Sequence, residues 1–70
     1  MKLTAGEFGI IMEALRELRK IELKDAETIA GFGSEESQQL AQRCREGAEE
    51  VDALMRKLRA NVPKIVKLEG

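Results

Sequence analysis

The chain has 70 residues, a formal net charge of −1, no histidine and one cysteine. This length allows a single domain with a small core. The near balance of 12 basic and 13 acidic residues argues against a generally basic nucleic-acid or membrane-surface binder. Without histidine and with one cysteine, zinc fingers, Cys–His dyads, Ser–His–Asp triads and internal disulfides are excluded. We therefore expect a protein without cofactor, metal ion or enzymatic activity.

The first residues do not have the pattern of a targeting segment. The longest apolar run near the start is Ile10-Ile11-Met12, whereas a signal peptide needs an apolar stretch of roughly 7–15 residues and a membrane span about 20. The sequence therefore predicts a soluble, cytoplasmic protein that does not contact membranes.

A first helix is predicted over residues 5–30. Thr4 and Glu7 have the spacing of a capping box, and Leu3 and Phe8 flank it as a hydrophobic staple. The apolar residues that follow have helical spacing and form one stripe: Phe8, Ile11, Met12, Leu15, Leu18, Ala26, Ile29 and Ala30. Gly31 ends the helix in this prediction, because glycine adopts the left-handed conformation cheaply. The alternative is a break near Lys24-Asp25, with Asp25 capping a short second helix.

A second helix is predicted over residues 35–61, after a turn at 31–34. Ser34 is a good N-cap, and acidic residues in the first turn favour the helix dipole. Pro63 should end the helix, because the residue before proline is driven out of helical geometry. Its apolar stripe comprises Leu40, Cys44, Gly47, Ala48, Val51, Leu54, Met55, Leu58 and Val62. Residues 62–70 are expected to form a short β-prone tail.

Two helices of this length joined by a tight turn predict an all-α, single-domain antiparallel hairpin. A hairpin of this size gains little net free energy from its own core. Ile10, Ala14 and Ile21 lie on a second edge of the first helix, where a monomer would expose them. We therefore expect a homodimer or higher oligomer that forms a four-helix bundle. In the tail, Ile65 and Leu68 are further candidate contacts, because an extended segment could add a strand to a partner.

One charged residue is predicted to face the apolar stripe of the first helix. Glu22 lies near the centre of that stripe, and Arg19 lies one turn earlier. Since a carboxylate in a helical core is costly unless it is paired, an Arg19–Glu22 pair or an interchain pair is predicted to form a polar layer that fixes register and oligomer state. The alternative is a polar anchor inside a central pocket. Cys44 is expected to be a small buried apolar residue, and the small residues around it allow either close helix packing or a groove for a partner side chain.

Charge is distributed unevenly along the chain. Residues 25–52 contain two basic and eight acidic residues, whereas residues 53–70 contain five basic and one acidic. The five basic residues are Arg56, Lys57, Arg59, Lys64 and Lys67. They are either an anion-binding patch or a solvated helix end that complements its own dipole.

In length, mild acidity and expected hairpin, the chain resembles the short plasmid-encoded RNA-binding hairpins of the Rop type, which dimerise into four-helix bundles. The resemblance carries no shared motif, so it assigns no residue a role. We expect a non-enzymatic oligomer that acts by protein–protein interaction, as a small adaptor or inhibitor such as mobile elements and phages encode. The alternative function is binding of RNA or a phosphorylated small ligand by the basic C-terminal end.

Overall fold

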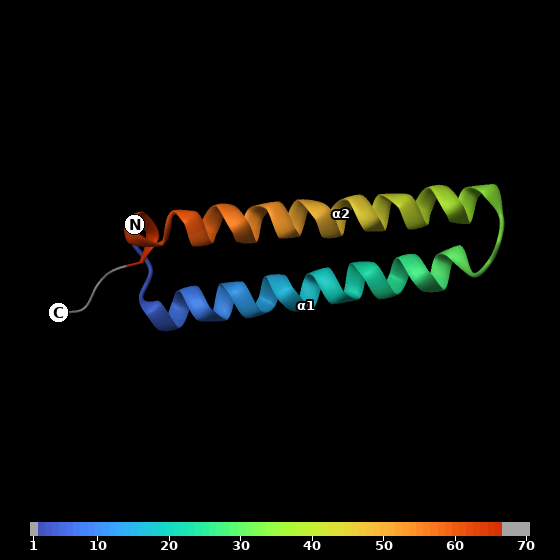
Figure 1. Ribbon diagram of the computed structural model, residues 1–70. Coiled ribbons are helices and arrows are strands. Elements are labelled where there is room, and N and C mark those ends of the chain that lie inside the picture. Colours follow the sequence, from blue (N-terminus) through green and yellow to red (C-terminus); the bar gives the residue numbers. More distant parts are fainter. Residues whose placement is uncertain (1, 67–70) are drawn as a thin grey trace.

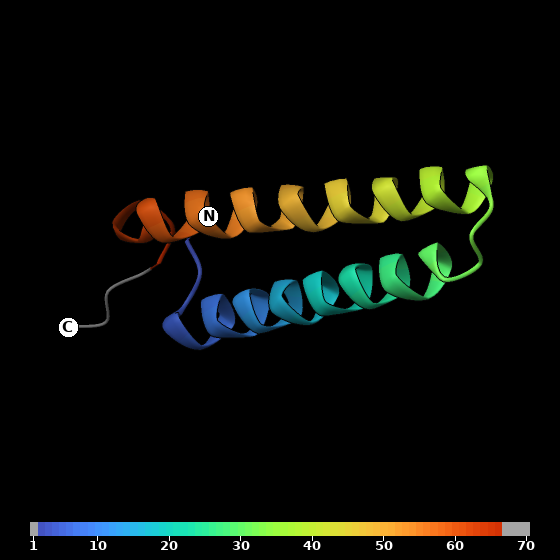
Figure 2. The ribbon, with the colours of Figure 1, turned by 45° about the vertical axis from the view of Figure 1, so that its right-hand side comes forward.

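The computed structural model describes residues 2–66, which form a helical hairpin 55 Å long and about 16 Å across. Helix α1 spans Ala5–Ala30, α2 spans Glu35–Ala60 and the single-turn α3 spans Val62–Ile65. Helices α1 and α2 run antiparallel along their whole length (Figure 1), and the rotated view keeps them side by side (Figure 2). The prediction of an all-α hairpin is confirmed. Helix α1 is continuous through Lys24-Asp25, so the alternative break does not occur.

Local hydrogen bonds fix where α1 begins. The amide N–H of Glu7 donates to Oγ1 of Thr4 at 3.1 Å, and the amide N–H of Thr4 donates to Oε1 of Glu7 at 2.8 Å. This is the reciprocal capping box predicted from the sequence. The two hydrogen bonds with Thr4 lower the pKa of the Glu7 carboxyl below its ordinary value, because they favour the charged form.

In the turn between the helices, the second of the two glycines adopts the left-handed conformation. Gly31 stays right-handed, with φ −63°, and its amide N–H donates to the carbonyl of Glu27 at 3.3 Å. Gly33 instead has φ +75°, the region that favours glycine because it lacks a Cβ. The predicted left-handed residue is therefore two positions later than expected. Ser34 then caps α2, accepting from the amide N–H of Ser37 at 3.1 Å.

The segment after α2 differs from the expected extended tail. Pro63 stands in the first turn of α3, where its fixed φ suits a helix and its missing N–H costs no hydrogen bond. Only at Val66 does the backbone become extended, and there it forms an isolated parallel bridge with Leu3. The amide N–H of Leu3 donates to the carbonyl of Ile65 at 2.8 Å, which ties the start of the chain to α3. Lys67 and Leu68 lie outside the described residues.

The core of the hairpin is built from small and flexible side chains. Its buried residues are Met12, Ala26, Ser37, Ala41, Ala48, Met55 and Val66. Within residues 2–66, no leucine or isoleucine is buried. Small residues allow the two helices to approach closely, and the larger aliphatic side chains of Leu15, Ile29 and Leu58 are only half-buried. None of the helices in this range has the length and apolar character that crossing a membrane requires.

Candidate interaction surface

The exposed apolar residues of α1 and α2 occupy the same position relative to the seam. Ile11 directly precedes buried Met12 in α1, and Leu40 and Leu54 directly precede buried Ala41 and Met55 in α2. One residue is a rotation of about 100° around a helix. Two antiparallel helices are related by an approximate two-fold axis perpendicular to their plane. The same rotation away from the seam therefore leads to the same face of the hairpin in both helices, so Ile11 of α1 lies on one face with Leu40 and Leu54 of α2.

We call this surface the apolar face. It consists of exposed and half-buried residues from both helices: Ile11 and Leu18 of α1, and Leu40, Val51, Leu54 and Leu58 of α2. Ile10, Ala14 and Ile21 continue from it onto the outer side of α1, because each lies about 180° around the helix from buried Met12. The most open isoleucines are Ile10, at 68% exposure, and Ile21, at 53%, and near the middle Leu18 and Leu54 are 42% and 44% exposed. Monomeric soluble proteins rarely expose a continuous apolar surface of this kind, which usually marks an interaction site.

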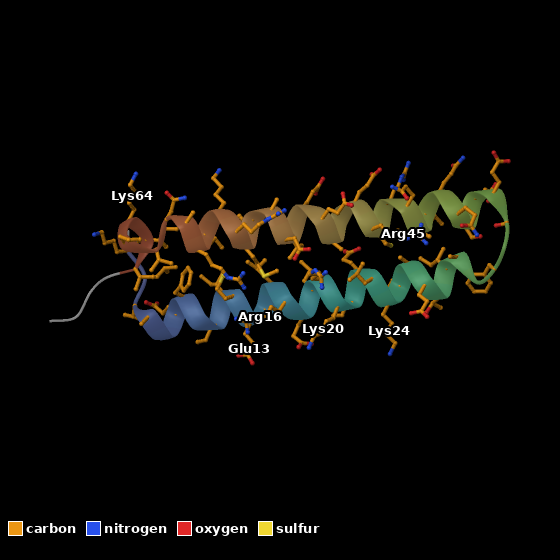
Figure 3. All side chains as sticks on the ribbon, viewed as in Figure 1. Glu13, Arg16, Lys20, Lys24, Arg45 and Lys64 are labelled. Carbon is orange, nitrogen blue, oxygen red and sulfur yellow. The ribbon has the colours of Figure 1, made fainter. Side chains whose placement is uncertain are left out.

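The opposite face of the hairpin is polar. Here the exposed residues directly follow buried or seam residues instead of preceding them: Glu13, Lys20, Glu27, Gln42, Glu49 and Arg56. We call this set the polar face. Figure 3 shows Glu13 and Lys20 extending from α1 into solvent, away from α2. The opposite face is therefore mainly charged, with Leu23 as an exposed apolar residue, whereas Asp25 and Glu36, which directly precede buried Ala26 and Ser37, add charges to the apolar face.

The structure places the predicted contacts only partly together. Ile10, Ala14 and Ile21 are all exposed, on the outer side of α1 beside the apolar face. Ile65 lies apart from them, half-buried in α3, with its carbonyl hydrogen-bonded to the amide of Leu3. Leu68 is outside the described residues. That Ile10, Ala14 and Ile21 contact a partner stays a prediction.

Sequence reasoning missed four members of the apolar face. Ile11, Leu18, Leu40 and Leu54 were assigned to the stripes expected to face each other inside the hairpin, but each is more than a third exposed. The sequence feature that could have identified these residues is an alternating spacing of three and four residues. It runs through Ile11, Ala14, Leu18 and Ile21 in α1, and through Leu40, Cys44, Gly47, Val51, Leu54 and Leu58 in α2. Such spacing is typical of a seam with another helix.

The expected pairing of Arg19 with Glu22 is replaced by a contact across the hairpin. Nε of Arg19 lies 2.8 Å from Oδ1 of Asp52, and both side chains are about 40% exposed. This nitrogen makes no hydrogen bond of acceptable geometry, so the short contact is an ion pair in which the N–H is not aligned with the oxygen. Arg19 therefore links α1 to α2 and does not neutralise Glu22.

Glu22 instead lies against the small residues of α2. A Cβ placed on Gly47 would be 3.4 Å from Oε2 of Glu22, so the carboxylate occupies the space left by the missing side chain. Cys44 is half-buried nearby. Burial raises the pKa of the Cys44 thiol, and the negative charges of Glu22 and Asp25 raise it further. The small residues of α2 thus accommodate a side chain of the same protein.

The basic C-terminal cluster is divided between different surfaces. Arg56 and Arg59 line a shallow, open depression together with Asp52 and Met55. Lys57 directly precedes Leu58 and so lies at the margin of the apolar face, apart from the two arginines. Lys64 extends from α3 at the end of the hairpin where the termini lie (Figure 3). Lys67 is outside the described residues, so the structure brings together only two of the five predicted side chains.

Within residues 2–66, no three His, Cys, Asp or Glu side chains lie where they could share a metal ion. Comparison of the chain with models of protein families, with curated proteins and with solved structures gave no match.

Proposed function

We propose that this protein is a non-enzymatic, self-associating helical hairpin that acts through protein–protein contact, as a small adaptor or inhibitor. A second copy covers the apolar face, and the two hairpins together form a four-helix bundle. The observation that carries the proposal is the distribution of apolar side chains. The fully buried residues of the two long helices are mainly alanine and methionine, whereas Ile10, Leu18, Ile21 and Leu54 are exposed.

Self-association supplies free energy that a lone hairpin lacks. Burying one leucine or isoleucine side chain contributes about 1.5–3 kcal/mol when it is fully removed from water, and the net stability of a small domain is only about 5–15 kcal/mol. The apolar face carries several partly exposed aliphatic side chains from each helix. Covering this face therefore contributes an amount comparable to the whole stability expected of a chain of this size.

Sedimentation equilibrium of purified protein tests the proposal directly. We expect the wild-type protein to be a dimer or higher oligomer at micromolar concentration. Leu18→Lys should weaken self-association by at least tenfold, because it places a charge near the middle of the apolar face. Gln42→Lys is the matched control: it adds the same charge on the polar face and should leave the mass unchanged.

Circular dichroism on the same samples separates loss of assembly from loss of folding. A wild-type protein that stays monomeric and fully helical at micromolar concentration would contradict the proposal. Equal weakening by Leu18→Lys and Gln42→Lys would also contradict it, because the contact would then not depend on the apolar face.

A second function is supported by the depression between Arg56 and Arg59, whose two guanidinium groups could bind phosphate oxygens of RNA or of a phosphorylated small ligand. Asp52 brings a carboxylate to the same depression, which opposes anion binding. A salt titration distinguishes the two functions. Phosphate contacts weaken steeply with salt, so ligand binding that survives 0.5 M salt and the change Arg56→Glu would exclude this second function.

A further inference from the structure

We infer that the second copy binds antiparallel to the first, so that the turn of one hairpin lies beside the termini of the other. The inference rests on the proposed self-association and specifies its geometry. Two hairpins can bring their apolar faces together in two symmetric ways. If the turns lie at opposite ends, α2 packs on α2 of the other copy. If the turns lie at the same end, α2 packs on α1 of the other copy.

The charges of α2 favour packing against its own antiparallel copy. The helix carries five acidic side chains before Val51, against Arg43 and Arg45. After Asp52 it carries three basic side chains and no acidic one: Arg56, Lys57 and Arg59. When two such helices lie antiparallel, the acidic part of each faces the basic part of the other. Complementary charges of this kind favour one docking direction over the other.

Two residues of α2 at the margin of the apolar face show the same order of an acidic residue before a basic one. Glu50 directly precedes Val51 and Lys57 directly precedes Leu58, so both lie along the outer edge of the face. They are seven residues apart, which is two turns of helix and about 10 Å. A two-fold axis that crosses α2 between them brings Glu50 of each copy beside Lys57 of the other.

The charges at the two ends of the hairpin oppose the same-end arrangement. With the turns at the same end, the Arg56, Arg59 and Lys64 side chains of both copies would gather at one end of the bundle. The acidic residues near the turn, Glu35 and Glu36 among them, would gather at the other end. Like charges on both sides of an interface oppose association.

A charge exchange within α2 distinguishes the two directions. In low-salt buffer, Glu50→Lys alone and Lys57→Glu alone should each weaken self-association by about tenfold, because each replaces attraction by repulsion at two symmetric positions. The double variant Glu50→Lys/Lys57→Glu should restore wild-type affinity, since the antiparallel contact regains opposite charges. Failure of the double variant to recover would overturn the inference, because Glu50 of one copy would then not lie beside Lys57 of the other.

A distance measurement gives an independent answer. Phe32 in the turn is 75% exposed, so Phe32→Cys in a Cys44→Ala background accepts a nitroxide label without disturbing the helices. In the antiparallel dimer the two labels should be about 40 Å apart, and in the same-end dimer within about 25 Å. A dimer with the shorter distance overturns the inference while leaving the proposed self-association intact. A monomer overturns both.

Discussion

Arg19 of α1 and Asp52 of α2 meet across the hairpin, with Nε of the arginine 2.8 Å from Oδ1 of the aspartate. Helices α1 and α2 are also held by a seam whose fully buried residues are mainly alanine and methionine, with few side chains of distinctive shape. A seam of small residues tolerates sliding of one helix along the other. The ion pair opposes such sliding, because it can form at only one relative position of the two helices.

The first prediction concerns the strength of this ion pair. In a double-mutant cycle with Arg19→Met and Asp52→Asn, we expect a coupling free energy of about 0.2–1 kcal/mol at low salt, since both side chains are partly exposed to water. The coupling should shrink at 0.5 M salt. Thermal unfolding at one fixed protein concentration measures it. A coupling that stays the same at high salt would show that the contact is not electrostatic.

The sequence predicted the local features of this fold because each depends on neighbouring residues. Thr4 and Glu7 are three positions apart, and so is the capping interaction that they form. The partner of Arg19 could not be found in this way. Glu22 was the nearest carboxylate by helical spacing, whereas Asp52 comes close only once the register of α1 against α2 is set. Register is a property of the packed pair and is not encoded in either helix alone.

For the same reason, the sequence could not show which apolar residues pack in the seam and which are exposed. Each helix has a stripe wide enough for two contacts, one with its partner in the hairpin and one beyond it. Periodicity places Ile11 and Met12 in the same stripe, but the structure buries Met12 and exposes Ile11. Pro63 shows a different limit. Helix α2 ends before Pro63, as expected, but the segment that follows forms the single turn of α3 instead of an extended tail, because the missing N–H of proline costs nothing in a first turn.

The second prediction concerns pH and the capping box. Because the folded state lowers the pKa of Glu7 through its hydrogen bonds with Thr4, the folded state binds a proton at this site less readily than the unfolded chain. The stabilisation from Glu7 is therefore complete above the ordinary pKa of glutamate, about 4.3. It is lost as the pH falls through the lower folded-state pKa. Glu7→Gln should flatten this part of the pH dependence.

Chemical denaturation between pH 3 and pH 7 at a fixed protein concentration tests this prediction. Glu13→Gln is the matched control, because Glu13 is an exposed carboxylate of the same helix outside the capping box. The wild-type protein and Glu13→Gln should lose more stability on acidification than Glu7→Gln. Identical pH profiles for all three proteins would refute the assigned role of the capping carboxylate.

The third prediction concerns the cysteine. Burial, together with the negative charges of Glu22 and Asp25, raises the pKa of the Cys44 thiol. Since the thiolate is the reactive form, alkylation by iodoacetamide should be slow at neutral pH and should accelerate only above the range of an ordinary cysteine. Glu22→Gln should move the midpoint of the rate profile to lower pH, because it removes one of the charges that disfavour the thiolate.

Two controls accompany the Cys44 measurement. Unfolded protein in denaturant should react with the ordinary pH dependence of a cysteine, and Glu13→Gln, far along α1 from Asp25, should leave the folded profile unchanged. A folded thiol that titrates at or below the ordinary pKa would contradict the prediction. The same would hold if Glu22→Gln moved the profile to higher pH.

The fourth prediction separates two glycines by their backbone conformation. Gly33 has φ +75°, so Gly33→Ala should destabilise the protein by about 1–2 kcal/mol, because a Cβ is strained in the left-handed region. Gly9 is the matched control: it lies inside α1, and a Cβ there would have no atom within 4 Å. Gly9→Ala should therefore stabilise the protein by about 0.5–1 kcal/mol through helix propensity alone. Thermal unfolding of both variants at equal concentration measures the difference, and a Gly33→Ala variant as stable as the wild type would show that the turn does not need this conformation.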